Sequence, residues 1–359
     1  MNKKYQIKTN VHISKNFLSN IKIKGKIILI VPKNLNRNIF QLVKNKFNKQ
    51  ILQIIIKPSG EPTSKMVNSY YKKILKPDML IVIGGGSTID FAKALSITNL
   101  KNKIQYYEFN NKINHSIPVN CIPTTCGSGS DISPYSVIIN SETRRKFTIS
   151  DPKLIPKNTY IYPDLLKYIN KNVIFDSLYD AFSHCLEVYL NKDQNLKIKK
   201  LAFKGIGLGL SLLDKKIESK KYKDYMLLAL IGGACITKSR TSIMHTLSVA
   251  VSKYYNLPHG LLNLYLTNLA LEFNKPFIKK DISKIEKKWL NIKLSIWIKD
   301  LEMKNKKRLQ VNNKKINIKD VVTRMKQDKT LKNVCHNKLN NNNFQNLVKK
   351  LNEKNKNFL

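Results

Sequence analysis

Short, nearly continuous runs of apolar residues recur through the first half of the chain and alternate with segments of helical periodicity. Four runs have the length and the Ile/Leu/Val content of buried strands: residues 26–31, 51–56, 79–83 and 118–122. Between them, residues 38–47 and 64–75 repeat apolar positions at the spacing of one helix face. Strands that are apolar on both faces and alternate with helices are typical of a parallel sheet covered by helices. This half of the chain therefore predicts an α/β domain.

The pattern changes near residue 165, where strand-like runs give way to long segments of helical periodicity. These segments are residues 176–190, 197–213, 225–237, 242–254 and 261–273. We therefore expect an α/β domain over residues 1–165 and an all-helical domain over residues 166–359. The four consecutive asparagines at 340–343 are expected to lie in a surface loop.

Composition narrows the class of protein. The 359 residues include 65 Lys and Arg against 23 Asp and Glu, which gives a formal net charge of +42. Only six of these cations are Arg, the residue that nucleic-acid readers favour, so we interpret the excess as lysines on solvated surfaces and expect no nucleic-acid partner. No apolar run approaches the roughly 20 residues of a membrane span, and the five cysteines form no C-x-x-C pair. We expect a soluble, cytoplasmic protein without a membrane partner.

Two glycine- and hydroxyl-rich loops follow predicted strands. The strand 79–83 runs into Gly84-Gly85-Gly86-Ser87, and the strand 118–122 runs into Pro123-Thr-Thr-Cys-Gly-Ser-Gly-Ser130. Glycines let backbone N–H groups approach a pyrophosphate, and the following helix N-terminus favours negative charge. An isolated loop of this kind is equally typical of a tight strand–helix turn. Because both loops lie beyond the carboxyl ends of strands in one sheet, together they favour a dinucleotide site.

Four residues have the chemistry and the spacing of a metal site. Asp180 and His184 are four residues apart on one helix face, His245 lies in another apolar segment, and His259 follows fourteen residues later in a Pro-His-Gly sequence. One carboxylate and three neutral imidazoles suit Zn²⁺ or Fe²⁺ with a coordination position left open. Each residue alone has a plainer interpretation, as a core histidine or an ordinary helix pair, and spacing does not prove that the four converge.

Taken in order, these motifs resemble the iron-containing alcohol dehydrogenases. The resemblance rests on GGGS-x-x-D-x-x-K from Gly84, PTT-x-G-x-GS from Pro123, D-x3-H-x2-E from Asp180 and H-x13-HG from His245, and it extends from about residue 26 to residue 274. It implies a Rossmann-like dinucleotide-binding domain, an all-α C-terminal domain of the dehydroquinate synthase-like fold, and a cleft that holds NADH or NADPH and a divalent metal. It also implies that an aldehyde is reduced to a primary alcohol at the metal.

The resemblance assigns roles to individual residues. Asp180, His184, His245 and His259 match the family's metal ligands and so its catalytic centre, for Fe²⁺ or Zn²⁺. The residues that match its cofactor-binding positions are Gly85, Gly86, Ser87, Asp90, Thr124, Thr125, Ser128 and Lys146.

Two positions depart from the family pattern. A histidine that many members carry four residues after the third ligand is Val249 here, so a histidine proton relay is absent. An aspartate that binds ribose in many NAD-preferring members is replaced by Pro32-Lys33, which favours the 2′-phosphate of NADPH.

The segment before the third ligand points to one branch of the family. Arg240-Thr-x3-His245 resembles the phosphonoacetaldehyde reductases, and a phosphonate dianion needs a cation such as Arg240 near the metal. We therefore expect reduction of phosphonoacetaldehyde to 2-hydroxyethylphosphonate, with Arg240 at the substrate.

Three alternatives stay open. They are a general short-chain alcohol or diol dehydrogenase, in which Arg240 pairs locally, a dehydroquinate-synthase-like relative, and a polyanion-binding protein. A homodimer is one assembly compatible with the family.

Overall fold

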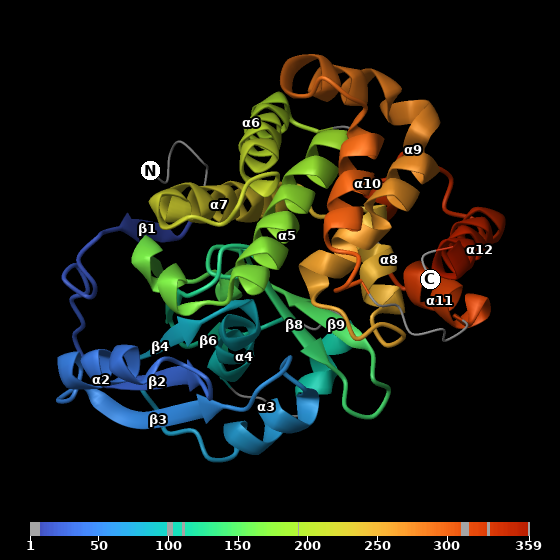
Figure 1. Cartoon of the computed structure of the whole chain (residues 1–359). Coiled ribbons are helices and arrows are strands. Elements are labelled where there is room, and N and C mark those ends of the chain that lie inside the picture. The colour runs from blue at the N-terminus through green and yellow to red at the C-terminus, as the bar shows by residue number, and fades with distance from the viewer. Residues whose placement is uncertain are drawn as a thin grey trace. The chain divides into compact units, whose positions relative to one another are not determined.

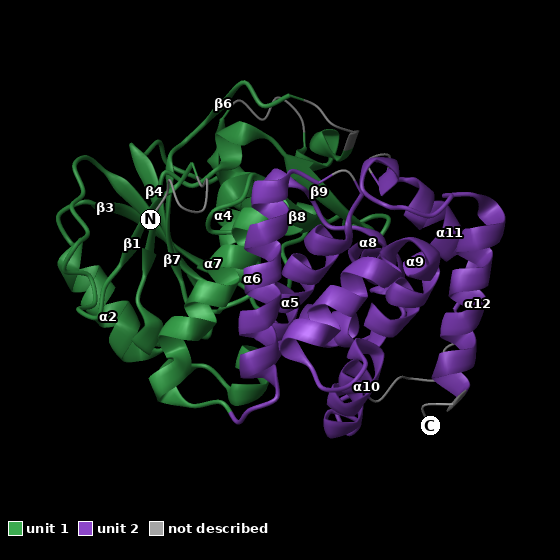
Figure 2. Ribbon diagram, turned by 90° about the horizontal axis from the view of Figure 1, so that it is seen from above, with its two compact units in different colours: residues 1–174, 217–237 green, residues 175–216, 238–359 purple. Residues whose placement is uncertain are grey.

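The computed structural model describes residues 8–98, 103–109, 112–192, 194–309, 316–328 and 331–357. By internal contacts the chain divides into two compact units (Figure 2). The first unit contains residues 1–174 and 217–237, and the second contains residues 175–216 and 238–359. The first break thus lies later than the boundary at 165/166 that we expected, and the sequence pattern does not show that residues 217–237 return to the first unit.

The first unit is built on a six-stranded parallel sheet with the order β1-β10-β7-β4-β2-β3 (Figure 1). The strands are β1 (Asn10–Ile13), β2 (Ile27–Pro32), β3 (Ile51–Lys57), β4 (Met79–Gly84), β7 (Val119–Pro123) and β10 (Asn158–Ile161). The helices α2 (Arg37–Lys46), α3 (Ser64–Tyr71) and α4 (Gly86–Ser96) follow β2, β3 and β4. The predicted α/β domain is confirmed, with its four predicted strands and two helices within a few residues of their expected bounds.

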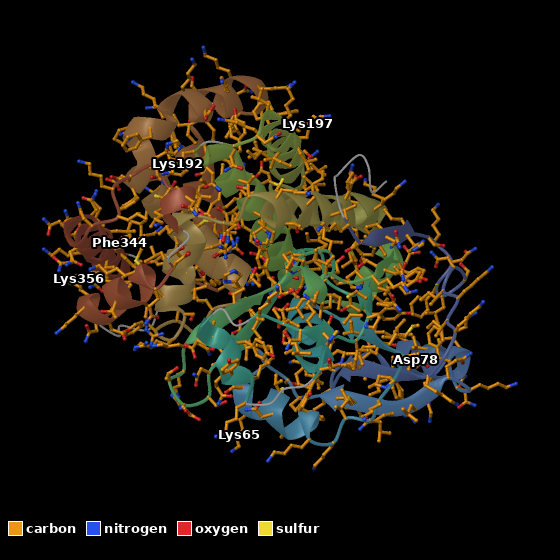
Figure 3. The ribbon with its side chains drawn as sticks, turned by 180° about the vertical axis from the view of Figure 1, so that it is seen from behind. Lys65, Asp78, Lys192, Lys197, Phe344 and Lys356 are labelled. Atoms are coloured by element: carbon orange, nitrogen blue, oxygen red, sulfur yellow. The ribbon has the colours of Figure 1, made fainter. Side chains whose placement is uncertain are left out.

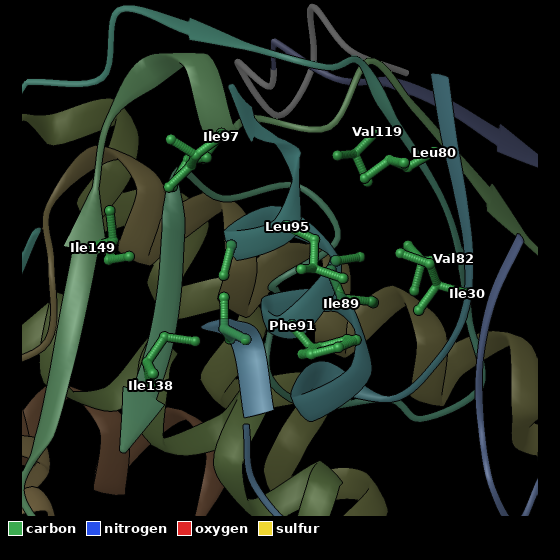
Figure 4. Close-up of a cluster of buried hydrophobic side chains, with 14 of the residues drawn as sticks. Ile30, Leu80, Val82, Ile89, Phe91, Leu95, Ile97, Val119, Ile138 and Ile149 are labelled. Atoms are coloured by element: carbon green, nitrogen blue, oxygen red, sulfur yellow. The ribbon is translucent and has the colours of Figure 1, made fainter. Parts of the chain in front are cut away.

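Successive residues of the central strands pack on opposite faces of the sheet, which explains why these strands are apolar throughout. On one face Ile30, Leu80 and Val82 pack with Phe91 and Leu95 of α4 (Figure 4). On the other face Leu29, Val31 and Ile81 pack with Ile39 and Val43 of α2. The sheet is therefore covered by helices on both sides, and its residues form two separate cores.

Two strand pairs outside the six-stranded sheet were not predicted. The strands β8 (Tyr135–Ile139) and β9 (Lys146–Ser150) form an antiparallel hairpin, and β5 (Ile97–Thr98) pairs with β6 (His115–Ser116). The unit is completed by α7 (Tyr222–Lys238), whose Gly233 lies against Gly129 of the second glycine-rich loop. A Cβ at either glycine would overlap the other, so this close approach requires both.

The second unit is helical, as the sequence predicts. Its helices are α5 (Lys171–Leu190), α6 (Leu196–Leu213), α8 (Ile243–Val251), α9 (His259–Trp289), α10 (Leu294–Lys304), α11 (Ile318–Lys326) and α12 (Asn341–Asn357). The helix α9 is much longer than the predicted segment 261–273, because it continues through Pro276. No helix in the described ranges is both long and apolar enough to cross a membrane.

The asparagine run does not form the surface loop that we expected. Residues 341–343 are the first turn of α12, and the side-chain oxygen of Asn340 accepts the backbone N–H of Asn343 at 2.9 Å. This bond satisfies one of the N–H groups that a helix start leaves unpaired. The run is therefore a helix start, and its polarity reflects its exposed position.

Candidate metal centre and nucleotide-binding loops

The four predicted metal ligands converge in the second unit. Ligand atoms of Asp180, His245 and His259 all lie within 4.8 Å of one another. The Oδ1 atom of Asp180 is 3.5 Å from Nε2 of His245, 3.6 Å from Nε2 of His259 and 3.7 Å from Nε2 of His184. His184 thus reaches the same carboxylate oxygen, although it is not a member of the mutually close group. The four side chains therefore meet at one carboxylate oxygen, and their binding of a metal stays a prediction.

Helix packing brings these residues together. Asp180 and His184 lie one turn apart on α5, His245 lies on α8, and His259 is the first residue of α9. Gly260 permits this arrangement, because a Cβ there would overlap the backbone carbonyl of Asp176 on α5. Asp176 is one turn before Asp180, so the contact places the start of α9, and with it His259, beside the carboxylate.

Glu187, a buried carboxylate, fixes the orientation of His245. It accepts the backbone N–H groups of Ser242 at 2.9 Å and Met244 at 2.7 Å, and it lies 2.7 Å from Nδ1 of His245. A hydrogen on Nδ1 that bonds to Glu187 leaves the lone pair of Nε2 directed toward Asp180 and available to a cation. Sequence reasoning included Glu187 only as part of a family motif and did not recognise this role.

The electrostatics of the cluster suit a cation. Burial lowers the pKa of His184 to about 4, which keeps its imidazole neutral. Burial opposes ionisation of Asp180, but the three neighbouring imidazoles outweigh it and hold the pKa of Asp180 below its usual range. Burial also acts against protonation of His245, yet the carboxylate of Glu187 raises its pKa to about 9. The site therefore offers one ionised carboxylate, and a cation has to displace a proton from His245.

The donor set fits a divalent transition metal. A carboxylate with several imidazoles is a ligand set for Zn²⁺ or Fe²⁺. Nδ1 of His184 and Oδ1 of Asn263 are buried here without a hydrogen-bond partner among the described residues, which is unusual unless another group completes the site. The side chains of Asp180, His184 and His245 are 6–10% exposed and that of His259 is 34% exposed, so the site opens on the side of His259.

The two predicted nucleotide loops lie side by side in the first unit. The backbone N–H of Thr124 donates to the carbonyl of Gly84 at 3.0 Å. A Cβ at Gly86 would overlap Ser128, and one at Gly85 would lie 3.0 Å from Thr125, so the loops touch because these two residues are glycines. A small pocket opens here, lined among others by Gly86, Thr125, Ser128 and, from α7, Met226, Ala229 and Leu230.

The other predicted cofactor residues bond to the chain itself. The hydroxyl of Ser87 donates to the carbonyl of Gly60 at 2.7 Å, and Lys146 pairs with Glu61 at 2.7 Å. The buried carboxylate of Asp90 accepts the hydroxyl of Ser130 and, at 3.1 Å, the backbone N–H of Val137. Asp90 therefore joins α4 to the second loop and to β8, and its direct contact with a cofactor stays a prediction.

Arg240 lies in the segment between α7 and α8 with a strained backbone. Its φ angle is +91°, which an arginine rarely adopts. The side-chain amide of Asn191 donates to its carbonyl at 3.0 Å and to the hydroxyl of Ser239 at 3.2 Å. Strain of this kind persists only where the surroundings hold it, and such positions cluster at functional sites.

Comparison with known proteins agrees with this arrangement over nearly the whole chain. The sequence model described as iron-containing alcohol dehydrogenase matches residues 5–163, and that of the Fe-containing alcohol dehydrogenase family, C-terminal, matches residues 174–356. A 4-hydroxybutyrate dehydrogenase of Clostridium kluyveri is 26% identical over 63% of this chain and 64% of its own length. The match thus spans slightly less than two thirds of that relative.

Solved structures confirm the fold. A crystal structure of an iron-containing alcohol dehydrogenase has a TM-score of 0.85 at 20% identity and covers 97% of this chain and 98% of its own. The sulfoacetaldehyde reductase from Bifidobacterium kashiwanohense, in complex with NAD⁺, has a TM-score of 0.79 at 18% identity. It covers 96% of this chain and 97% of its own.

Proposed function

Because the chain belongs to the iron-containing alcohol dehydrogenase family, we propose that it is a metal-dependent oxidoreductase that reduces an aldehyde to a primary alcohol with NADH or NADPH. The observation that carries the proposal is the convergence of Asp180, His245 and His259 in one buried cluster. When bound, a divalent cation supplies a Lewis acid for the carbonyl oxygen and a reduced nicotinamide supplies the hydride.

The residues of the second unit bind the metal and orient its ligands. Asp180 and the imidazoles of His184, His245 and His259 hold Fe²⁺ or Zn²⁺, while Glu187 keeps His245 in the tautomer that a cation requires. The half-exposed His259 marks the side that a substrate oxygen enters. Val249 on α8 has no group that moves a proton, so we assign protonation of the product oxygen to solvent water.

The residues of the first unit bind the cofactor. Backbone N–H groups at Gly85, Gly86 and the start of α4, with the hydroxyls of Thr125 and Ser128, suit a pyrophosphate. Lys33 is exposed just after β2, the strand next to β4, so it lies at the same sheet edge as the glycine loop. Its charge favours the 2′-phosphate of NADPH, and we propose NADPH as the preferred cofactor.

For the substrate we propose phosphonoacetaldehyde, reduced to 2-hydroxyethylphosphonate. Arg240 supports this assignment, because it is a cation five residues before a metal ligand and its backbone is held in a strained conformation. Two of the similar proteins are named for substrates that carry an anionic group, 4-hydroxybutyrate and sulfoacetaldehyde. A short aldehyde with a terminal anion is thus the substrate class that the chain suits.

The test is oxidation of NADPH and NADH by metal-loaded protein with phosphonoacetaldehyde, sulfoacetaldehyde and butyraldehyde. We expect Arg240→Ala to raise KM for the two anionic aldehydes by roughly 10- to 100-fold, the range for loss of a hydrogen bond to a charged group, and to leave butyraldehyde unchanged. Arg144→Ala is a matched control, because Arg144 also has a positive φ, +54°, but lies in the β8–β9 turn.

If wild type reduces butyraldehyde as efficiently as phosphonoacetaldehyde, and Arg240→Ala changes KM for neither, Arg240 is structural and the protein is a general short-chain alcohol or diol dehydrogenase. Absence of turnover with every aldehyde would favour the non-redox, dehydroquinate-synthase-like alternative. The homodimer, the cytoplasmic location and the absence of a nucleic-acid partner stay predictions.

A further inference from the structure

Asn263, a side chain that sequence reasoning missed, occupies the centre of the metal cluster. It lies on α9 one turn after His259, and it is fully buried. Its Nδ2 atom is 3.0 Å from Oδ1 of Asp180, 3.1 Å from Nε2 of His245 and 3.4 Å from Nε2 of His259. These are the three residues whose ligand atoms form the mutually close group. The amide nitrogen, with two hydrogens to donate, therefore lies among the same three groups that a cation would bind, and it is also 3.5 Å from Oγ of Ser183.

A lone pair on a histidine nitrogen of this cluster cannot bind a metal and accept the Asn263 amide at the same time. A neutral imidazole has one hydrogen on a ring nitrogen and one lone pair on the other. Glu187 accepts from Nδ1 of His245, so once the ring has lost the proton that a cation has to displace, the lone pair on Nε2 is the only one that it offers, and Nδ2 of Asn263 lies 3.1 Å from that atom. A lone pair that accepts an N–H group is not available to a metal, and the positive end of the N–H dipole repels a cation.

The oxygen atom of the Asn263 amide does not compete with a metal for any group. Oδ1 of Asn263 is buried and has no hydrogen-bond partner among the described residues. Turning or withdrawing the amide therefore breaks no bond at Oδ1, and the cost of the movement lies in the contacts that Nδ2 makes with Asp180, His245 and His259 and, at 3.5 Å, with Oγ of Ser183.

We propose that Asn263 takes the place of the cation when the site is free of metal, holding Asp180, His245 and His259 together, and that metal binding displaces its amide from them. Asn263 is on this view a positioning residue that keeps the metal-free site assembled and lowers its affinity for metal. The proposal rests on the proposed function only in so far as the cluster binds a divalent cation.

The test is the affinity of metal-free protein for Zn²⁺, measured by competition with a chelating dye. Asn263→Ala removes contacts that exist only in the metal-free state, so we expect Zn²⁺ to bind roughly tenfold more tightly, as for loss of a hydrogen bond to a charged group. The thermal midpoint of the metal-free variant should fall further below wild type than that of its Zn²⁺-loaded form. Because affinity compares two states of one protein, a general loss of stability cancels.

Asn268→Ala is the matched control, since Asn268 lies on the same helix and its amide donates to the carbonyl of Ser295 at 3.1 Å, away from the cluster. Its Zn²⁺ affinity should equal that of wild type. If Asn263→Ala does not fold without metal, Asn263→Ser keeps a single donor and should bind Zn²⁺ more tightly than wild type by a smaller factor.

Weaker Zn²⁺ binding by Asn263→Ala would overturn the proposal, because it would mean that the amide supports the metal-bound site. Unchanged Zn²⁺ affinity would overturn it too, because Asn263 would then have no effect on metal binding. Wild type that binds no divalent cation would instead contradict the proposed function, so the two failures are distinguishable.

Discussion

Glu187 shows how much a single buried residue determines at this site. Both of its carboxylate oxygens are acceptors: one for the backbone N–H of Met244, the other for the backbone N–H of Ser242 and for Nδ1 of His245. It therefore sets the path of the chain into α8 as well as the direction of the imidazole. A residue that orients a ligand affects metal affinity without touching the metal.

We expect Glu187→Gln to weaken Zn²⁺ binding by roughly 10- to 100-fold and to lower the free energy of unfolding by about 1–3 kcal/mol. The physical reason is that the amide NH₂ of glutamine would face an N–H donor where the carboxylate presents an acceptor. Dye competition and chemical denaturation measure the two effects. Glu272→Gln, which removes an exposed ion pair with Lys350, is the control and should change neither. Full retention of affinity would show that His245 is oriented by other contacts.

At the scale of elements, the site depends on the close approach of α5 and α9. The contact between Gly260 and the carbonyl of Asp176 leaves no room for a side chain. Asp176 is itself held by Arg308, whose Nη2 atom donates to both carboxylate oxygens, at 2.7 and 2.6 Å, so this end of α5 is not free to yield. If residue 260 carried a side chain, the start of α9 would therefore be the part that has to move.

Gly260→Ala should consequently displace His259 from Asp180 and reduce Zn²⁺ affinity at least tenfold, with a loss of stability of about 1–3 kcal/mol from overpacking. Leu269→Ala, further along α9, removes buried methyl groups without adding an atom. It should lower stability by about 2–5 kcal/mol and keep the affinity. Dye competition measures the Zn²⁺ affinity and chemical denaturation the stability. Equal Zn²⁺ binding by Gly260→Ala and wild type would contradict this account.

The elements also show where sequence information ends. The strands of the sheet core were predictable because burial on both faces leaves an unbroken apolar signature, and the metal ligands because few residue types bind metals. The edge strand β1 and the β8–β9 hairpin were not, since their strands depend on partners rather than on a strong local pattern. Glu187 and Asn263 were missed as functional residues because their roles exist only once α5, α8 and α9 have packed.

The whole molecule carries a large positive charge. Labelled lysines such as Lys65, Lys197 and Lys356 extend from the ribbon in Figure 3, and all three are exposed. Like charges at this density repel one another and destabilise the compact state. The net charge of +42 is thus a cost to stability that salt can relieve.

Raising NaCl from about 20 mM to about 500 mM should therefore raise the thermal midpoint of the metal-free protein, because the screening length falls to a few ångströms. The measurement is a melt in the presence of a chelator, with KCl as a control for an effect specific to sodium. A midpoint that falls with salt would mean that ion pairs such as Lys199–Asp281, at 2.6 Å, outweigh the repulsion.

The chain order of the two units has a consequence for synthesis on the ribosome. The first unit is incomplete until residues 217–237 have been made, although its sheet ends with β10 at Ile161. The second glycine-rich loop, whose Gly129 lies against Gly233, waits for a helix that is translated about a hundred residues later. In the interval residues 175–216 emerge without the rest of the second unit, so the two units mature together rather than one after the other.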